Sequence, residues 1–569
     1  MKFVIAFLFS MLSILPFLSA QNSGRIVVDG KFDDWSTNSQ YVSRLDDASN
    51  DGGDVDIKYI EVSNDDDYLF MHFELSAEID IVDDFETPSR MKLFIDADNN
   101  ANTGLSVNGI GADYLFDFRN RDVIYYTSNT NYTYYSFYDM GYAHLPTVTS
   151  EEFELLMDRY YFNQPVFTNT IKLFLKEDID DDETEVMTYT MINDMPDFQP
   201  INMSKPNLDH FRLLTYNTLQ DGLLENDQAI PIKRIIAAAD PDIIHLNEVY
   251  DTPAFFVENE MEDILDGDWT AHKYNGENIV ASRYPIITTY EIYYGRLGAA
   301  LIDLPDDKFD KDLLAVVGHL SCCGKDDQRQ DQVDALIEFL ADAKTPGGIL
   351  TLEEGTPMLF SGDMNFVGYD EQINTVIDGN IMNNNVYGPD TKPDWDNGNF
   401  SDFRPLQMSA PTATTWNTKF PDPGDYPSGR LDFVFYGSSA LQPRKGFVIN
   451  TRDLSDEDLS AYGLLQSDSY FASDHLPLVT DFSGLSTNSV KEAVEAAALN
   501  VYPNPVGDVL FFESEEQWTY FKIFNMEGKL IREASLTTRE INLSGLESGS
   551  YILELSNNKF EVKKNFIKQ

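Results

Sequence analysis

The sequence is short of cysteine, of basic residues and of long hydrophobic runs. Two cysteines among 569 residues cannot form the disulfide framework that stabilises many small secreted domains. Lysine and arginine number 40 against 96 aspartate and glutamate, and the formal net charge of −56 disfavours non-specific adhesion to nucleic acid or anionic membranes. Beyond position 20 no apolar run is long enough to span a bilayer. The composition predicts a soluble chain that depends on its own hydrophobic cores.

The first residues have the pattern of a secretory signal. Lys2 is followed by an apolar run over residues 3–18, and small residues, Ser19 and Ala20, occupy the cleavage positions. An N-terminal membrane anchor is the alternative, but the run is shorter than the roughly 20 residues that a spanning helix needs. We therefore expect a signal peptide over residues 1–20 and a mature chain that starts at Gln21 and has no transmembrane segment.

The first large region of the mature chain has an all-β pattern. Residues 21–195 contain β-rich runs at 68–75 and 91–95, separated by Asp and Asn turns, which is typical of a sandwich of antiparallel strands. Residues 196–209 hold three prolines and no periodic pattern, so they predict a linker to a second domain.

Residues 210–482 alternate strands with helices and predict an α/β domain. Apolar strands occur at 211–216, 242–246 and 357–360. A helix whose first turn begins at Pro231 is expected between the first two of them. A further helix is indicated by apolar residues at helical spacing, namely Val333, Leu336, Ile337 and Leu340.

The C-terminal region is again all-β. After a polar segment over residues 483–498, residues 499–569 contain YPNP (502–505), KIFNMEGK (522–529), LSGLESGSYILEL (543–555) and a lysine-rich end. This combination resembles the C-terminal sorting domain of the type IX secretion system, a small immunoglobulin-like fold. The resemblance implies contact with the type IX secretion machinery, export through periplasm and outer membrane, and removal of the tail. A small immunoglobulin-like binding module is the alternative.

In the middle region, polar residues follow apolar strands repeatedly. Ligands collect at the ends of strands in many α/β and layered β folds, so residues at these positions are candidates for a site. In chain order they are Asn217, Glu248, His319, Asp363, Asn365, Asp432, Asp474 and His475.

Their order and spacing resemble the signature of the endonuclease/exonuclease/phosphatase family. The similarity runs from about residue 211 to residue 482 and includes ASRYPI (281–286) and the Arg329/Gln332 pair. It implies a four-layered, DNase-I-like sandwich with phosphoesterase activity. Two departures are visible: Asn247 stands where the family usually has Gln, and Met364 where Phe or Leu is common.

The resemblance implies a divalent-metal site. Glu248 and Asn217 would be ligands of Mg²⁺ or Mn²⁺, and Asp474 could join them. These hard cations prefer oxygen ligands and keep several waters, which suits a site with few protein ligands.

It also implies roles for the remaining residues. Asp363 would orient or deprotonate the attacking water, and Asn365 and His319 would hydrogen-bond the non-bridging phosphate oxygens. His475 would contact the scissile phosphate. Asp432 would fix the tautomer of either His475 or His319, and the sequence does not decide between the two histidines.

Three functions are compatible with this pattern. The first is an extracellular phosphodiesterase or endonuclease that acts on DNA or RNA. The second is a phosphomonoesterase, or a phospholipid or inositol-phosphate hydrolase, which the acidic composition favours because a nuclease needs a locally basic groove. The third is a non-catalytic surface protein that binds glycans through its N-terminal region.

VDGKFDDW (28–35), the strand 91–96 and the loop 96–104 resemble the β-sandwich of family-nine carbohydrate-binding modules. The resemblance implies a glycan as a ligand, and we expect this region to serve targeting rather than catalysis. Asp96, Asp98 and Asn100 have the spacing of oxygen ligands for a structural Ca²⁺, but Ala101 stands where a helix-loop-helix calcium loop needs Gly.

Cys322 and Cys323 are adjacent and lie just beyond His319. A disulfide between neighbours would be strained, because consecutive Cα atoms lie closer together than disulfides prefer. Two alternatives remain: a strained bridge that shapes the rim of the site, or two free thiols.

Overall fold

The computed structural model forms two compact units that are divided after Gly484. The signal peptide expected over residues 1–20 lies outside the described residues, as does the segment 485–498 of the expected second linker. No helix within the described part of the chain combines the length and the apolar character that crossing a membrane requires. The structure describes residues 24–47, 53–82, 91–161, 164–179, 181–395, 397–419, 421–484, 500–513, 518–525, 529–536, 538–556 and 561–569.

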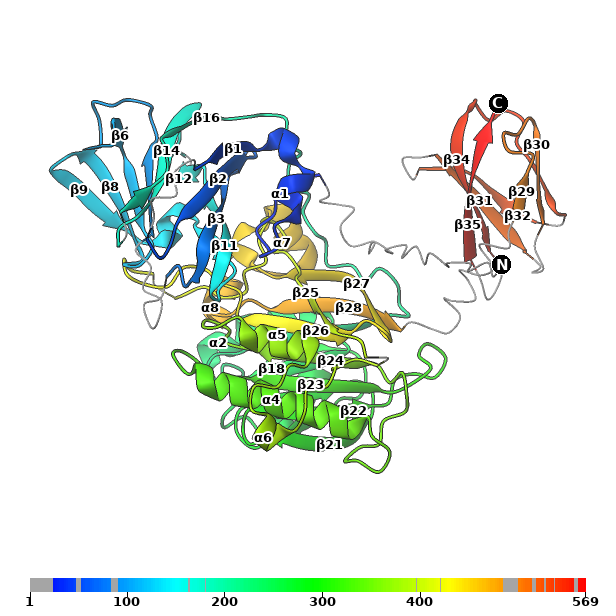
Figure 1. Ribbon diagram of the computed structural model, residues 1–569. Helices are drawn as coiled ribbons and strands as arrows, with labels where there is room; N and C mark the ends of the chain where they lie inside the picture. Colours follow the sequence, from blue (N-terminus) through cyan, green and yellow to red (C-terminus); the bar gives the residue numbers. More distant parts are fainter. Residues whose placement is uncertain are drawn as a thin grey trace, which may run out of the picture. The chain divides into compact units, whose positions relative to one another are not determined.

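Residues 24–195 form an antiparallel β-sandwich, as the sequence predicts (Figure 1, blue to cyan). One sheet has five strands, in the order β1 (Ser43–Asp46), β2 (Ile57–Asn64), β3 (Tyr68–Ile79), β11 (Ser150–Asp158) and β10 (Ala143–Leu145). The other has seven: β15 (Asp182–Glu183), β14 (Thr170–Glu177), β4 (Met91–Asp96), β7 (Tyr114–Asp117), β8 (Asp122–Ser128) and β9 (Asn131–Tyr135), with β16 (Met187–Thr190) also paired to β14. Short elements connect them, among them α1 (Asp33–Thr37), η3 (Phe137–Met140) and the hairpin of β5 (Leu105–Val107) and β6 (Ile110–Ala112).

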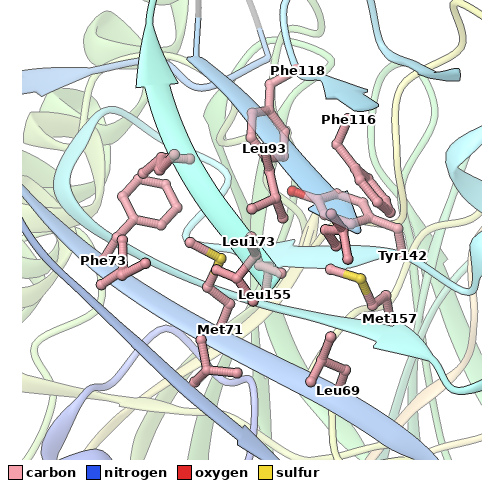
Figure 2. Packing of buried hydrophobic residues seen from close by; sticks show 14 of the residues in the cluster. Leu69, Met71, Phe73, Leu93, Phe116, Phe118, Tyr142, Leu155, Met157 and Leu173 are labelled. Carbon is pink, nitrogen blue, oxygen red and sulfur yellow. The ribbon is translucent and has the colours of Figure 1, made fainter. Parts of the chain in front are cut away.

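The core of the sandwich follows from the alternation of side chains along each strand. Leu69, Met71 and Phe73 of β3 point toward the facing sheet, where they pack in one cluster with Leu93 and Leu173 (Figure 2). Phe70 and His72, which alternate with them along β3, point the other way and are buried as well. The five-stranded sheet is therefore covered on both faces.

The middle region contains two six-stranded sheets. The first has the order β19 (Thr270–Lys273), β20 (Ile279–Ser282), β18 (Ile243–Asn247), β17 (Phe211–Asn217), β28 (Leu478–Gly484) and β27 (Leu441–Val448). The second has the order β21 (Ile286–Tyr293), β22 (Leu297–Ile302), β23 (Leu313–His319), β24 (Met358–Asp363), β26 (Asp432–Gly437) and β25 (Phe400–Phe403). The pairs β17–β18 and β23–β24 are parallel, and the other pairs are antiparallel.

Consecutive residues of the central strands belong to different cores, which produces four layers. Leu213 and Ile243 pack between the two sheets, whereas Leu214 and Ile244 pack against helices on the outside of the first sheet. These helices are α2 (Asn226–Ala239), α3 (Ala254–Ile264), α7 (Asp456–Tyr462) and α8 (Asp468–Ala472). The second sheet is covered in the same way by α4 (Asp326–Ala343), α5 (Glu371–Asp378) and α6 (Asn384–Tyr387) (Figure 1, green). The expected DNase-I-like architecture is confirmed.

One predicted helix boundary is wrong. Helix α2 begins at Asn226, so Pro231 is its sixth residue rather than part of its first turn. The expected apolar face, Ile235 and Ile236, is buried as predicted. The stripe expected around Val333 and Leu336 is the buried face of α4.

The C-terminal unit has two small sheets around one core that includes Leu510, Ile523 and Leu553. The first sheet consists of β29 (Asn500–Tyr502), β30 (Val509–Glu513) and β33 (Glu540–Asn542). The second consists of β32 (Leu530–Ser535), β31 (Tyr520–Asn525), β34 (Gly549–Ser556) and β35 (Glu561–Lys568). This agrees with the expected small all-β sorting domain.

A buried ion pair joins β17 to β28. The guanidinium of Arg212 donates from Nε and Nη2 to the two carboxylate oxygens of Asp481, at 2.6 and 2.8 Å, and neither side chain is more than 2% exposed. Its Nη1 donates to the carbonyls of Met203 and Ala239. Every charged atom of the pair therefore has a partner, which buried charges require.

We predict that Asp481→Asn lowers the free energy of unfolding by about 3–5 kcal/mol, because it leaves the guanidinium of Arg212 buried without its counter-charge. The exposed pair of Lys311 and Glu353 offers a matched control, since Glu353 is 82% exposed and Glu353→Gln should cost less than about 1 kcal/mol. Urea unfolding followed by tryptophan fluorescence measures both. Equal losses in the two variants would contradict the prediction.

Candidate active site

The strands of both sheets bring the predicted residues to one edge. Strands β17 and β24 end at Asn217 and Asp363, and β23 ends at His319 beside Asp363 in the parallel pair β23–β24. Strand β26 runs antiparallel to β24 and begins at this edge, so Asp432 lies opposite Asp363. His475 precedes β28, which is antiparallel to β17, and so it reaches the same edge.

Asp363 lies at the centre of the group. Its Oδ2 accepts a hydrogen bond from Nδ2 of Asn217 at 2.9 Å. The same oxygen lies 3.4 Å from Nε2 of His319 and 3.5 Å from Nε2 of His475. All four side chains are more than nine-tenths buried. One carboxylate oxygen therefore faces three nitrogen atoms that come from β17, from β23 and from the segment before β28.

Glu248 is the second carboxylate of the site. It follows β18, accepts from Nδ2 of Asn217 at 3.0 Å and from the backbone N–H of Gln220 at 2.9 Å. A carboxylate oxygen of Glu248, a carboxylate oxygen of Asp363 and a ring nitrogen of His319 lie within 4.8 Å of one another. Two carboxylates this close are the kind of oxygen donor set that Mg²⁺ and Mn²⁺ prefer, so the residues fit such an ion.

The contacts of Asn217 differ from those of a metal ligand. Its amide nitrogen faces both carboxylates, and its Oδ1 accepts from the backbone N–H of Leu219 at 3.0 Å. Rotation of the amide would exchange the two groups. Asp474 is half-buried, receives a 3.4 Å bond from Ser473 Oγ, and is not in the three-residue group around Asp363. Both ligand roles stay predictions.

His475 is the histidine that Asp432 serves. Nδ1 of His475 lies 2.8 Å from Oδ2 of Asp432, which fixes Nε2 toward Asp363. Burial opposes a charge on the imidazole, but Asp432 and Asp363 outweigh it and raise the pKa of His475 to about 10. His475 therefore carries a proton on Nε2 at neutral pH, where it can donate to an oxygen of a substrate.

His319 has a different carboxylate partner that the sequence did not indicate. Its Nδ1 lies 3.2 Å from Oε1 of Glu277, which also pairs with Arg296 and is 5% exposed. Burial opposes a charge on His319, yet Glu277 and Asp363 raise its pKa. Glu277 stands in a loop just before β20 rather than after an apolar strand. A search for polar residues at strand ends therefore passes over it.

Asn247 replaces the usual Gln without leaving a gap. It donates to Asn278 Oδ1 at 2.8 Å and to the carbonyl of Gly318 at 2.9 Å, and its Oδ1 accepts from the backbone N–H of Asp363. It thereby ties β18, β23 and β24 together directly behind the site. Met364 is fully buried in the core under the second sheet.

The backbone at the site has unusual conformations. Glu248 and Asn365 have φ values of 58° and 50°, which non-glycine residues seldom adopt. Gly362 has a φ of 146°, and a Cβ there would lie 1.9 Å from the carbonyl oxygen of Gly318. Such conformations persist only where the surrounding structure fixes them, and they cluster at functional sites.

The family models agree with this geometry. Residues 214–475 match the endonuclease/exonuclease/phosphatase family, and residues 500–569 match the secretion system C-terminal sorting domain. The middle region, residues 214–475, is an endonuclease/exonuclease/phosphatase-family domain. The chain is a hydrolase of phosphate esters, and its sorting domain marks it for secretion or for the cell surface. Neither model reaches residues 24–195, so the resemblance to carbohydrate-binding modules stays a prediction.

Several solved structures resemble the chain. The human Nocturnin catalytic domain is 17% identical, with 50% of this chain and 96% of that chain covered and a TM-score of 0.31. ANGEL2, a 2′,3′-cyclic phosphatase, is 16% identical over 48% and 95%, with a TM-score of 0.31. Sphingomyelinase C from Streptomyces griseocarneus is 14% identical over 48% and 99%, with a TM-score of 0.30. No protein of curated function matches the chain.

The structure also bears on the cysteine pair and on the acidic loop of the sandwich. Cys322 and Cys323 are free, exposed thiols whose Sγ atoms lie 2.7 Å apart, so the structure has no bridge between them. In the sandwich, Asp96 and Asp98 form a group with Asp113, with carboxylate oxygens within 4.8 Å of one another. A structural Ca²⁺ at Asp96, Asp98 and Asn100 stays a prediction.

We predict that Glu277→Gln lowers kcat/KM of the phosphoesterase by about 10- to 100-fold, the range typical of carboxylates that orient a histidine from behind. The neutral amide keeps the shape of the side chain but no longer stabilises a proton on His319. Steady-state kinetics from pH 5 to 9 measures the effect, and Glu353→Gln, on an exposed loop, is the control. Kinetics within twofold of wild type for Glu277→Gln would show that this carboxylate has no part in catalysis.

Proposed function

We propose that this chain is an extracellular, divalent-metal-dependent phosphodiesterase that acts on nucleic acid. The observation that carries the proposal is the convergence of two carboxylates and two carboxylate-backed histidines at one sheet edge. Hydrolysis of a phosphodiester needs an oriented water, neutralised phosphate oxygens and a stabilised leaving oxygen. This set of residues offers a group for each need.

Glu248 would hold the cation, together with the oxygen of Asn217 and with Asp474. When bound, Mg²⁺ or Mn²⁺ polarises the phosphoryl group and neutralises part of its charge. The carboxylates of Glu248 and Asp363 lie close together near His319, which supports a site for a small dication. The phosphate would then be positioned by the chain's own donors.

Asp363 would orient the attacking water and accept its proton at Oδ2. Nε2 of His475 would donate to an oxygen of the scissile phosphate, and Asp432 would keep Nδ1 of the same ring in its place. His319 and Asn365 would hydrogen-bond the non-bridging oxygens. The amide of Asn365 donates to the carbonyl of Leu320 at 3.2 Å, so this bond would have to be exchanged for one to substrate.

The second candidate is hydrolysis of a smaller phosphate ester, either a monoester or a phospholipid or inositol-phosphate headgroup. The net charge of −56 favours it, because a long polyanion is repelled more strongly than a small ester. The roles of Asp363 and of the two histidines are the same in both candidates. They differ in the size of the substrate and in whether its phosphate carries one ester group or two.

The test uses the full-length exported protein with plasmid DNA, single-stranded RNA, bis-para-nitrophenyl phosphate and para-nitrophenyl phosphate. Each is incubated with Mg²⁺, Mn²⁺, Ca²⁺ or a chelator. We expect cleavage of nucleic acid and of the diester with Mg²⁺ or Mn²⁺, and none with the chelator. Hydrolysis of the monoester alone would move the assignment to a phosphatase, and activity that survives the chelator would refute the metal site.

Asp363→Ala is the matching variant. We expect it to lower kcat by about a hundred- to ten-thousandfold, as loss of a group that acts in proton transfer typically does. Its circular dichroism spectrum should match that of wild type. Asp307→Ala, at an exposed loop position, serves as the control. Activity of Asp363→Ala within a few-fold of wild type would overturn the role given to this carboxylate.

A further inference from the structure

The segment of residues 411–430, Phe420 apart, lies between the N-terminal sandwich and the active site; we call it the interface segment. On its sandwich side, the N–H of Val28 donates to the carbonyl of Pro411 at 2.8 Å, and the N–H of Ala413 donates to the carbonyl of Val28 at 2.9 Å. Ala413 packs in one apolar cluster with Trp35 and Phe70 of the sandwich. The start of the segment is thus fixed to the sandwich like a strand to its neighbour.

The next residues of the same segment contact the catalytic residues. Thr415 accepts at Oγ1 from the backbone N–H of Asp432 at 2.9 Å, and its carbonyl accepts from Leu476 at 2.6 Å. Trp416 forms a backbone bridge with His475, and Asn417 donates from its N–H to the carbonyl of Asp474 at 2.8 Å. A few residues of the interface segment therefore connect the sandwich to the sheet edge that carries the active site.

Tyr138 of the sandwich holds the segment just after these contacts. Its hydroxyl accepts from the backbone N–H of Thr418 at 2.7 Å. Tyr138 is in the short helix η3, which is fixed by a reciprocal capping box of Ser136 and Asp139. Burial raises the pKa of the Tyr138 hydroxyl, so it stays protonated and can both accept and donate. The capping box and this hydrogen bond together fix the position of Tyr138 against the segment.

Thr147 of the sandwich contacts two catalytic loops at once. Its hydroxyl lies 2.9 Å from the carbonyl oxygen of Phe366 and 3.2 Å from that of Arg430. Phe366 directly follows Asn365, and Arg430 stands two residues before Asp432. The neighbouring Val148 packs into the core under the second catalytic sheet. One sandwich side chain thus links the loop of Asn365 to the loop of Asp432.

We propose that the sandwich is part of the catalytic unit, with Tyr138 and Thr147 as positioning residues for the active site. Through the interface segment they fix the backbone around Asp432 and around Asp474 and His475. The inference rests on the proposed phosphoesterase chemistry at that edge. It replaces the expectation that the N-terminal region serves targeting alone, since a separable targeting module would not hydrogen-bond to the loops that carry catalytic side chains.

Two nearly isosteric variants, Tyr138→Phe and Thr147→Val, test the proposal in the full-length protein. Each removes one hydroxyl and keeps the packing. We expect the double variant to lower kcat on bis-para-nitrophenyl phosphate by at least about tenfold, as displacement of supporting groups around an active site typically does, with KM changed by less than twofold. The single variant Thr147→Ser keeps the hydroxyl, so its kcat should equal that of wild type.

Hydrogen–deuterium exchange supplies a readout that does not depend on turnover. Peptides that cover residues 416–432 should exchange faster in the double variant, while peptides of β3 and β11 should not change. The controls are Tyr132→Phe and Thr188→Val, two exposed positions of the same sandwich, which should match wild type in both measurements.

The outcomes separate this proposal from the proposed function. An active wild type with a double variant within twofold of the controls refutes the positioning role and leaves the phosphoesterase assignment intact. Faster exchange without loss of kcat refutes it as well, because the segment would then be held without consequence for catalysis. A wild type that is inactive on all four substrates refutes the proposed function. In that case, unchanged exchange of residues 416–432 in the double variant would also refute the role of Tyr138 and Thr147 in holding the interface segment.

Discussion

Asp363 and Glu248 place two carboxylates at one edge of a buried sheet, and the side chains around them offset their repulsion. Asn217 donates to both, and the nearest ring nitrogens of His319 and His475 lie 3.4 and 3.5 Å from Asp363. Like charges repel more strongly away from bulk water, because the effective dielectric constant is lower there. A divalent cation relieves that repulsion, so the closeness of the carboxylates is itself a source of affinity for metal.

This arrangement depends on strand direction more than on any single contact. The parallel pairs β17–β18 and β23–β24 end together, and the antiparallel neighbours β26 and β28 begin at the same edge. Because alternate side chains of these strands fill separate cores, a slip of one residue would turn the site inward. The buried pair of Arg212 and Asp481 lies at the opposite end of β17 and β28 and fixes their register.

The sequence predicted the parts of the site that follow apolar strands. Asn217, His319 and Asp363 are examples, since each terminates a strand whose pattern is legible without the structure. Contacts between distant loops were not predictable in this way. The sequence does not decide whether Asp432 pairs with His475 or with His319. It gives no indication of Glu277, because its partner His319 lies on another strand and its own surroundings are polar.

Composition predicts a domain boundary at residues 196–209, but it does not predict that the regions on its two sides pack into one compact unit. Prolines mark the segment 196–209 as irregular, and it is irregular. Yet Met203 within it is buried against the first catalytic sheet, and its carbonyl accepts from Arg212. Composition does not distinguish a linker that packs against a domain from one that stays in solvent, because packing depends on the surface of the neighbouring domain. For the same reason the sequence pattern does not indicate that Thr147 contacts the loops of Asn365 and Asp432.

The position of the metal ion tests the proposed active site. Crystals of the protein grown with Mn²⁺ and measured near the manganese absorption edge give an anomalous signal at the ion. We predict a peak within coordination distance of a carboxylate oxygen of Glu248, on the side that faces Asp363, and loss of that peak in Glu248→Gln. Absence of a peak at this edge in an enzyme that is active with Mn²⁺, or a peak only at Asp96, Asp98 and Asp113, would contradict this prediction.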